Sequence, residues 1–321
     1  MRLHVVSGKG GTGKTTVAAA LALALAGRPG SRVLLCEVEG RQGLAQLFDV
    51  PPLPYEERRV AGAAGGGEVW ALAIDPEEAL LEYLEMFYGM RRAGKTLKRL
   101  GAVDFATTIA PGMRDVLLTG KAMEAARRRR ADGAPVYDAV VMDAPPTGRV
   151  TRFLNVNSEV VGLARVGPIK GQAATVMGLI RSPETAVHLV TILEEMPVQE
   201  TADGVAALTE VDLPVGAIVV NMTRAPLLSP SDLAAAREGR LDATEVTGQL
   251  KAAGLEADGA LVTTLLAEAA DHADRVALEE DGRERLTALA RPSVELPLLA
   301  GGMDLGALHE LAAILRAGLL T

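Results

Sequence analysis

Cysteine and aromatic residues are scarce in this chain of 321 residues, which limits the cross-links, the metal sites and the kind of core that it can form. A single cysteine, Cys36, rules out an intramolecular disulfide and any metal site built from several cysteines. Its place in the apolar run Val33–Cys36 indicates a small buried core residue. Aromatic residues make up 3% of the chain and hydrophobic residues 49%, so the core has to be built from Ala, Val, Leu and Ile. Such a core suits a parallel sheet covered by helices.

The chain also lacks an excess of basic residues and any long apolar run. The 41 Asp and Glu residues outnumber the 33 Lys and Arg residues, giving a formal net charge of -8. General nucleic-acid binding requires a basic surface, so we expect no nucleic-acid partner. The one basic block, Arg127 to Arg130, is typical of the solvated end of a helix. The apolar run Val17 to Ala26 is too short to span a bilayer and follows a Gly-rich loop, so we expect a cytoplasmic protein without an integral membrane segment.

Short β-branched runs alternate with helical patterns along the chain. This alternation predicts an α/β fold with a mostly parallel sheet of about seven strands flanked by helices. The expected strands are Leu3–Val6, Val33–Val38, Trp70–Ile74, Ala139–Met142, Val187–Ile192, Gly216–Val220 and Val294–Leu296. We expect a single domain over residues 1–321, although the length alone allows two. Helical stretches at approximately 76–131, with one segment at Lys95–Gly101, and 150–186 should form one inserted helical subdomain.

A Gly-rich loop after the first expected strand matches the pattern G-x-x-x-x-G-K-[ST]. It consists of Gly8, Lys9, Gly10, Gly11, Thr12, Gly13, Lys14, Thr15 and Thr16. An apolar strand precedes it and an Ala/Leu-rich helix follows it, which is the setting that a phosphate-binding P-loop requires. Glycines let successive backbone N–H groups converge on phosphate oxygens, and the helix N-terminus adds partial positive charge. We therefore predict ATP or ADP binding, with Lys14 at the β- and γ-phosphates and Thr15 ligating Mg²⁺.

A second signal of a nucleotide site is the apolar strand Ala139–Met142, which ends in Asp143 and a Pro/Gly turn. Asp143 stands where a Walker B aspartate holds the Mg²⁺ shell, here through water. Together with the P-loop, this strand predicts a P-loop NTPase fold.

Several motifs resemble those of a known family. Lys9, directly after the first glycine, resembles the signature of the deviant Walker A ATPases, which include MinD and ParA proteins. Asp143–Gly148, continued by Arg152-Phe153-Leu154, closely resembles switch II of the arsenite-pump and tail-anchored-protein-targeting (ArsA/Get-type) ATPases. Three more segments are similar to switch I, a post-strand turn and the adenine loop of that family: Val33 to Glu39 and Leu44, Val198–Thr201, and Pro297–Leu299. The resemblance implies an ATP hydrolase that works as a dimeric conformational switch.

The resemblance also assigns roles to particular residues. Lys9 would cross the dimer interface to the partner's nucleotide, in the manner of an arginine finger, so one chain alone would be an incomplete site. Asn221, at the end of an expected strand, falls where the family reads adenine, although Asn is also a common turn residue there. Pro297 and Leu298 would lie in the adenine loop. The resemblance implies four catalytic residues for ATP hydrolysis: Lys9, Lys14, Glu39 and Asp143.

Switch I departs from the family pattern, because Glu39-Gly40 replaces an Asp-Pro pair. Glutamate carries its carboxylate one methylene farther out, and a displacement of about 1 Å can slow a reaction by on the order of a hundredfold. Glu39 is the candidate for orienting the attacking water on its spacing, and it is a further candidate metal ligand. Glu37, two residues earlier and on the same face if both lie on a strand, is the alternative.

The cysteine count narrows the family resemblance. One cysteine supplies neither the thiolates that activate the arsenite pump nor the paired-cysteine zinc clip of the eukaryotic targeting factors. The single P-loop resembles bacterial half-length ATPases that can pair with a related subunit. The expected partner is therefore a second copy of this chain, in a homodimer, or a related ArsA-like ATPase, in a heterodimer.

A hydrophobic client protein is a further expected partner. Flexible apolar side chains in the helical stretches suit an adaptable groove, and they are equally typical of helix packing: Met86, Phe87, Tyr88, Met90, Met113, Met123 and Met177. Two other functions stay open. The Glu39-Gly40 pair allows a weakly hydrolysing ATP-binding subunit that serves a catalytic paralogue. A MinD/ParA-like positioning ATPase would need a basic tail or face, and the amphipathic stretch Leu305–Leu320 holds only Arg316 as a strong base and is interpreted as a docked helix.

Overall fold

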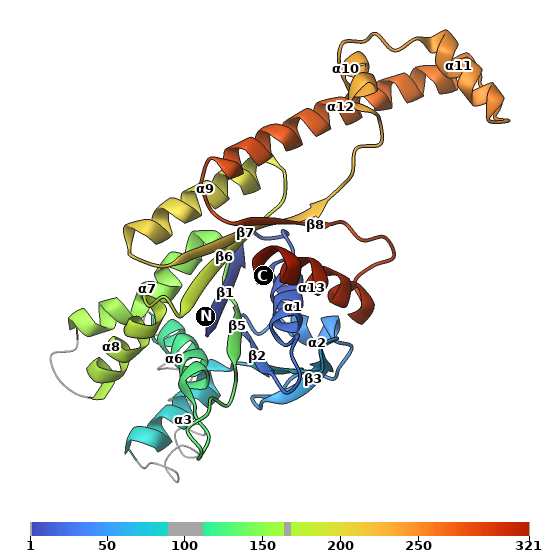
Figure 1. Cartoon of the computed structure of the whole chain (residues 1–321). Coiled ribbons are helices and arrows are strands. Elements are labelled where there is room, and N and C mark those ends of the chain that lie inside the picture. Colours follow the sequence, from blue (N-terminus) through green and yellow to red (C-terminus); the bar gives the residue numbers. More distant parts are fainter. Residues whose placement is uncertain (1, 89–111, 164–167, 321) are drawn as a thin grey trace.

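The computed structural model describes residues 2–88, 112–163 and 168–320. An eight-stranded sheet lies at its centre, in the order β3-β4-β2-β5-β1-β6-β7-β8, with helices on both faces (Figure 1). The strands are β1 (Leu3–Gly8), β2 (Arg32–Glu37), β3 (Arg58–Gly62), β4 (Glu68–Ala73), β5 (Ala139–Asp143), β6 (Thr185–Thr191), β7 (Val215–Thr223) and β8 (Ser293–Pro297). All pairings among them are parallel except β3 with β4. The α/β fold with a mostly parallel sheet is confirmed.

The strand β3 is the one that the sequence pattern did not predict. It pairs antiparallel with β4 at the edge of the sheet, and its register shifts between Arg59 and Ala61. Charged residues and a bulge are typical of edge strands, because an edge strand has a neighbouring strand on one side only and its other side faces solvent. The segment therefore lacks the β-branched run by which the other seven strands were predicted.

The carboxyl ends of the central strands meet at one edge of the sheet. The strand β1 lies between β5 and β6, and β2 lies beside β5. In parallel α/β sheets, ligands bind outside the carboxyl ends of the strands, where the chain connections diverge. This edge carries Gly8, Glu37 and Asp143, each the last residue of its strand.

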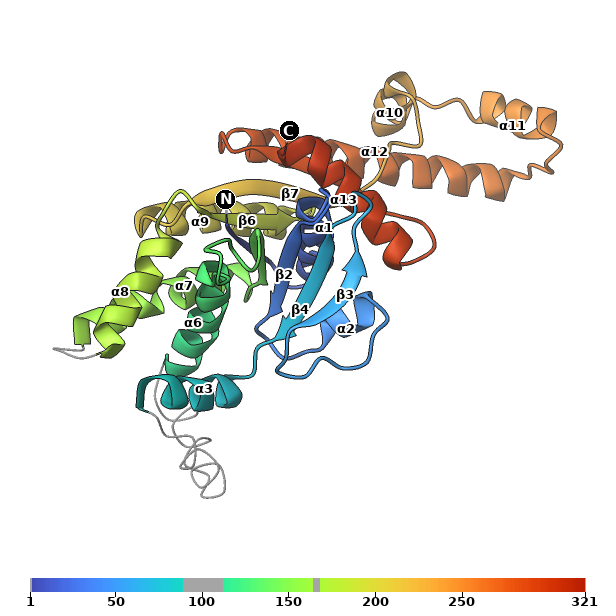
Figure 2. The ribbon, with the colours of Figure 1, turned by 60° about the horizontal axis from the view of Figure 1, so that its bottom comes forward.

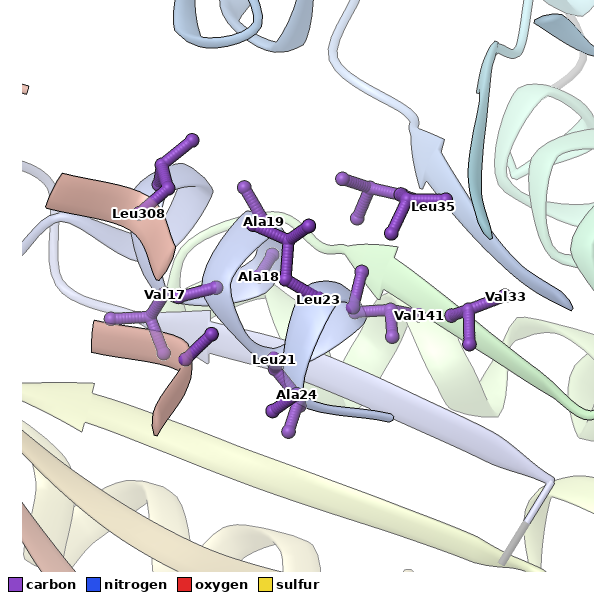
Figure 3. Close-up of a cluster of buried hydrophobic side chains, with 14 of the residues drawn as sticks. Val17, Ala18, Ala19, Leu21, Leu23, Ala24, Val33, Leu35, Val141 and Leu308 are labelled. Atoms are coloured by element: carbon purple, nitrogen blue, oxygen red, sulfur yellow. The ribbon is translucent and has the colours of Figure 1, made fainter. Parts of the chain in front are cut away.

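One face of the sheet is covered by α1 (Lys14–Leu25), α2 (Gly43–Leu47) and α13 (Leu305–Leu319). The side chains of α1 lie between the sheet and Leu308 of α13 (Figure 3). Residues from Val17 to Ala24 are all buried, and many are alanines that let the helix approach its neighbours closely. The C-terminal stretch is a docked helix, as expected, because Leu308, Leu311 and Leu315 are buried in the same cluster.

The other face is covered by α3 (Pro76–Tyr88), α6 (Met113–Arg127), α7 (Thr147–Leu163), α8 (Pro168–Ile180) and α9 (Glu195–Glu210). The first four correspond to the two expected helical stretches and contact one another. Met123 and Met177 are buried in this core, so their structural role is helix packing. Lys95–Gly101, Met90 and the side chains of Met86, Phe87 and Tyr88 lie outside the described part of the structure.

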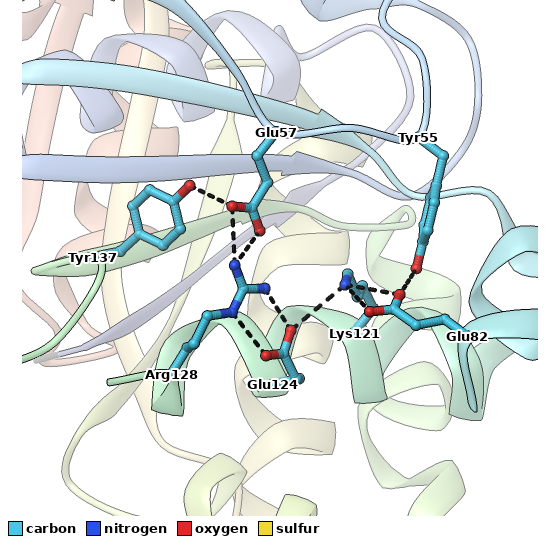
Figure 4. A network of polar contacts seen from close by, with 7 residues as sticks. All are labelled: Tyr55, Glu57, Glu82, Lys121, Glu124, Arg128 and Tyr137. Carbon is cyan, nitrogen blue, oxygen red and sulfur yellow. Dashed lines mark hydrogen bonds and ion pairs between the residues drawn. The ribbon is translucent and has the colours of Figure 1, made fainter. Parts of the chain in front are cut away.

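A polar network joins α3 and α6 to the loop ahead of β3 (Figure 4). Its members are Tyr55, Glu57, Glu82, Lys121, Glu124, Arg128 and Tyr137. Arg128 Nη1 lies 2.8 Å from Glu57 Oε1, and Arg128 Nη2 lies 2.6 Å from Glu124 Oε2. The expectation that the whole block Arg127 to Arg130 is a solvated helix end is therefore wrong for Arg128, whose guanidinium is paired with two carboxylates. Glu124 is an i,i+4 neighbour on the same helix, whereas Glu57 is distant in the sequence.

Three helices between β7 and β8 form an arm that projects from the body (Figures 1 and 2). They are α10 (Pro230–Arg237), α11 (Ala243–Ala252) and α12 (Gly259–Thr287). The 29 residues of α12 extend for about 43 Å at the α-helical rise. Ser229, Asp242 and Asp258 cap the three helices by accepting a backbone N–H. No helix in the described ranges is long and apolar enough to cross a membrane.

Candidate nucleotide site

The P-loop connects β1 to α1 at the carboxyl edge of the sheet. Gly13 has φ 83°, and a Cβ there would lie 2.3 Å from Asn221 Nδ2. A Cβ on Gly8 would lie 2.2 Å from the carbonyl oxygen of Val190 on β6. Both positions therefore require glycine. Gly13 needs it for its left-handed backbone, and at both Gly8 and Gly13 a neighbouring atom lies too close for a Cβ. A tight glycine-rich turn at a helix N-terminus is the setting in which backbone N–H groups can converge on a phosphate.

The side chains of the loop converge on the Lys9 carbonyl oxygen. It accepts a hydrogen bond from Thr12 Oγ1 at 2.9 Å and from Lys14 Nζ at 3.4 Å. The Lys14 ammonium therefore lies inside the loop, on the side where phosphates are expected. This contact is long and its acceptor is neutral, so an anionic phosphate oxygen would bind the Lys14 ammonium more strongly.

Thr15 and Asp143 are brought together from distant parts of the sequence. The Thr15 hydroxyl donates a hydrogen bond to Asp143 Oδ2 at 2.7 Å, while Asp143 Oδ1 is buried without a hydrogen-bond partner among the described residues. Burial raises the pKa of Asp143 to about 6, with Glu37 and Glu39 acting in the same sense and Thr15 and Lys14 opposing them. A buried carboxylate oxygen without a partner fits a site that expects a cation or its bound water.

The donor set around Asp143 suits Mg²⁺. This ion keeps several waters and takes one or two protein oxygens together with substrate phosphates. No cluster of three or more His, Cys, Asp and Glu side chains able to hold a metal exists within the described ranges, so these residues form no all-protein metal cage. Thr15 and Asp143 beside a phosphate loop fit the sparse coordination that Mg²⁺ prefers.

Glu37 and Glu39 have different environments. The strand β2 ends at Glu37, so the two side chains do not share a strand face. Glu37 is 2% exposed and accepts hydrogen bonds from the backbone N–H groups of Gln42 and Leu44, at 2.5 and 3.1 Å, which fixes the start of α2. Glu39 lies in the following loop, with Arg41 at 3.6 Å and Arg149 at 4.0 Å. Glu37 therefore orders switch I, and Glu39 is the carboxylate that remains accessible.

The residues expected around adenine lie at the same edge of the sheet. Asn221 is buried inside β7, which continues to Thr223, so it is not the turn residue that its sequence position allowed. Its Nδ2 donates a hydrogen bond to the Thr12 carbonyl at 2.9 Å and thus supports the P-loop. Pro297 ends β8, and the Leu298 N–H bonds to the Thr223 carbonyl at 2.9 Å.

Two contacts of the site were not evident in the sequence. Lys9 Nζ lies 2.6 Å from Glu200 Oε1 on α9, across a separation of 191 residues. The Ser7 hydroxyl donates to the Pro145 carbonyl at 2.6 Å and joins the end of β1 to switch II. For Glu200 the only signal was its place in the turn that resembles the family's post-strand turn, and no pattern in the sequence pointed to Ser7.

Comparisons with known proteins decide the family. The sequence profile described as "Anion-transporting ATPase" matches residues 1–181. ATPase BagA of Mycobacterium tuberculosis (strain ATCC 25618 / H37Rv) is 53% identical over 312 residues, which cover 97% of this chain and 92% of that protein. The chain belongs to the anion-transporting ATPase family.

More distant members of the anion-transporting ATPase family are similar over two thirds of the chain. ATPase GET3 of Kluyveromyces lactis is 26% identical over 249 residues, covering 67% of this chain and 70% of that protein. The arsenical pump-driving ATPase of Acidiphilium multivorum is 28% identical over 239 residues, covering 67% of this chain and 38% of that protein. The expected membership in the arsenite-pump and targeting ATPases is confirmed, and the chain is an ArsA-like ATPase.

Proposed function

We propose that this ATPase binds ATP with Mg²⁺ at the P-loop and acts in the cytoplasm as a dimeric conformational switch on a client or partner protein. The contact between Thr15 and Asp143 supports the nucleotide site most directly, because it joins the two expected Mg²⁺-shell residues beside the phosphate loop. Family membership supports ATP hydrolysis. The dimer and the client are inferred from the resemblance and from the position of Lys9.

The binding roles follow from the positions of the P-loop groups. The N–H groups around Gly13 and the N-terminus of α1 would hold the phosphates, and Lys14 would neutralise the β- and γ-phosphates. Mg²⁺ held by Thr15, and by Asp143 through water, would stabilise the charge that develops on the transferred phosphoryl group. Asn221 supports the loop through a hydrogen bond to the Thr12 carbonyl, while Pro297 and Leu298 would border the adenine.

Glu39 is proposed to orient the attacking water. Its side chain is 22% exposed and has positive partners in Arg41 and Arg149. A carboxylate engaged by two guanidinium groups has fewer free lone pairs for water. This arrangement favours a second candidate function, namely a slowly hydrolysing ATP-binding subunit that serves a catalytic paralogue.

The switch itself is proposed to start at Asp143 and to act on the helices. Switch II runs from Asp143 through Pro145, which is held by Ser7, to Thr147 at the start of α7. A change in the Mg²⁺ shell therefore has a short covalent path to α7, which contacts α6 and α8. We infer that residues 76–131 and 150–186 act as the helical subdomain that responds to nucleotide.

The exchange of Lys14 for Ala tests the nucleotide site. It removes the mobile cation of the P-loop, so ATP affinity measured by calorimetry with Mg²⁺ should fall at least about tenfold, or roughly 1.4 kcal/mol. Lys251→Ala, on α11 of the arm, is the matched control and should bind as the parent does. An affinity of Lys14→Ala within about twofold of the parent would show that ATP binds elsewhere.

A further inference from the structure

The ammonium of Lys9 is already engaged within its own chain. Lys9 Nζ lies 2.6 Å from Glu200 Oε1, and the two side chains are 32% and 36% exposed. The contact follows from the topology, because β1 and β6 are neighbours in the sheet. The loop after β1 and the helix α9 after β6 therefore begin at the same edge, and the second turn of α9 places Glu200 against Lys9.

The turn of α9 that carries Glu200 is fixed on its other side. The side-chain oxygen of Gln199 accepts a hydrogen bond from Arg285 of α12 at 2.7 Å. Val198 is buried in a small apolar cluster that includes Leu286, and Thr201 is buried with its hydroxyl bonded to the Pro197 carbonyl at 2.8 Å. Glu200 is therefore presented from a rigid turn, which lowers the entropic cost of holding Lys9.

We propose that Glu200 is a positioning residue for Lys9, which retains the ammonium in its own subunit and competes with the partner's nucleotide for it. This inference rests on the proposed function, in which Lys9 acts across a dimer. A lysine offers one compact charge, so moving Lys9 to a second γ-phosphate requires leaving Glu200. The strength of the pair then opposes closure of the dimer, because an interaction made only in the open form lowers the population of the closed form.

The exchange of Glu200 for Gln removes the competing charge and keeps the shape. The dimer formed with Mg²⁺ and a slowly hydrolysed ATP analogue should become about two- to fivefold tighter, the range expected for a pair that is about one-third exposed. Sedimentation velocity measures this dissociation constant, for the chain alone or mixed with a related ATPase subunit. Glu195→Gln removes the same charge from an exposed position on the same helix and should leave the constant unchanged.

A double-mutant cycle separates this role from a general effect on α9. In a Lys9→Ala background, Glu200→Gln should have no further effect on the dissociation constant, because the residue acts only through Lys9. An unchanged or weaker dimer for Glu200→Gln, or an effect that persists without Lys9, would overturn the inference while leaving the dimer intact. A parent protein that binds ATP and never dimerises would overturn both the proposed switch and this role of Glu200.

Discussion

At the scale of single residues, Glu37 and Glu39 show how two nearby acids take different roles. Glu37 is buried, and its oxygens accept hydrogen bonds from backbone N–H groups at the start of α2. Its carboxylate therefore has a structural role. Glu39 is contacted, among the residues that the structure describes, by two guanidinium groups at 3.6 and 4.0 Å. Contacts of that length and exposure are weak, so a water molecule can compete with the two guanidinium groups for the Glu39 carboxylate.

The exchanges of Glu39 for Asp and for Gln test this assignment. Asp shortens the side chain and should preserve or raise ATP turnover, whereas Gln cannot accept a proton and should lower turnover by on the order of a hundredfold. Nucleotide affinity should stay near that of the parent in both. Steady-state phosphate release and calorimetry provide the two readouts.

Glu37→Gln serves as the comparison for the Glu39 variants. It weakens the cap of α2, so its expected effect is a lower melting temperature. If both Glu39 variants turned over like the parent while a folded Glu37→Gln protein were inactive, the catalytic carboxylate would be Glu37.

The residues found from the sequence are those whose function depends on local pattern. Lys14 and Thr15 follow from one motif, and Asp143 follows from the end of an apolar strand. Glu200 could not be found in this way, because its contact with Lys9 joins residues 191 positions apart. Such a pair depends on which strands are neighbours in the sheet, and no pattern in the sequence predicted that β1 lies beside β6.

At the scale of elements, β1 and β6 are joined by two buried histidines. His188 Nδ1 accepts the Ala217 N–H at 3.1 Å, so the neutral ring carries its proton on Nε2 and donates it to His4 Nδ1 at 3.0 Å. Burial lowers the pKa of His188 to about 4 and that of His4 to about 3, with the neighbouring His188 adding to the shift of His4.

These histidines predict a pH dependence of stability. Their folded pKa values lie below the unfolded value of 6.5, so the unfolded chain binds more protons as the pH falls below about 6.5. Each histidine then lowers the free energy of unfolding by up to about 1.4 kcal/mol per pH unit, while Asp143, with its raised pKa, acts in the opposite sense. Urea unfolding between pH 5 and 7.5 measures the slope.

Nuclear magnetic resonance of the imidazole protons provides the direct check. The His4 and His188 resonances should shift by no more than about a tenth of a full titration between pH 7.5 and 5 in the folded protein. A titration of either ring near pH 6.5 would contradict the buried neutral pair.

The sequence predicted the elements with strong apolar patterns, and it did not predict the elements that bury few apolar side chains. The seven β-branched runs became strands, whereas β3 is an edge strand with charged residues. The arm also had no clear pattern, since α11 has no buried residue and α12 buries four of its 29. Hydrophobic periodicity identifies helices through the face that packs on a core, and most of the arm has no such face.

At the scale of the whole molecule, the carboxyl edge of the sheet gathers the P-loop, both switches and Lys9. The family profile covers residues 1–181, which include β1, β2, β5 and both switches. The Lys9 ammonium is bonded to Glu200 and lies on a loop at this edge. In the proposed switch, a second subunit would face this edge and receive the charge of Lys9 at its γ-phosphate.

The central claim is that ATP with Mg²⁺ closes a dimer in which Lys9 acts across the interface. Light scattering should show a dimer that forms or tightens when a slowly hydrolysed ATP analogue and Mg²⁺ are added, with this chain alone or with a related ATPase subunit. Lys9→Ala should still bind ATP and should lose most of its turnover, because the γ-phosphate then lacks its cation from the partner. A chain that stays monomeric under all these conditions, or a Lys9→Ala protein with normal turnover, would contradict the account.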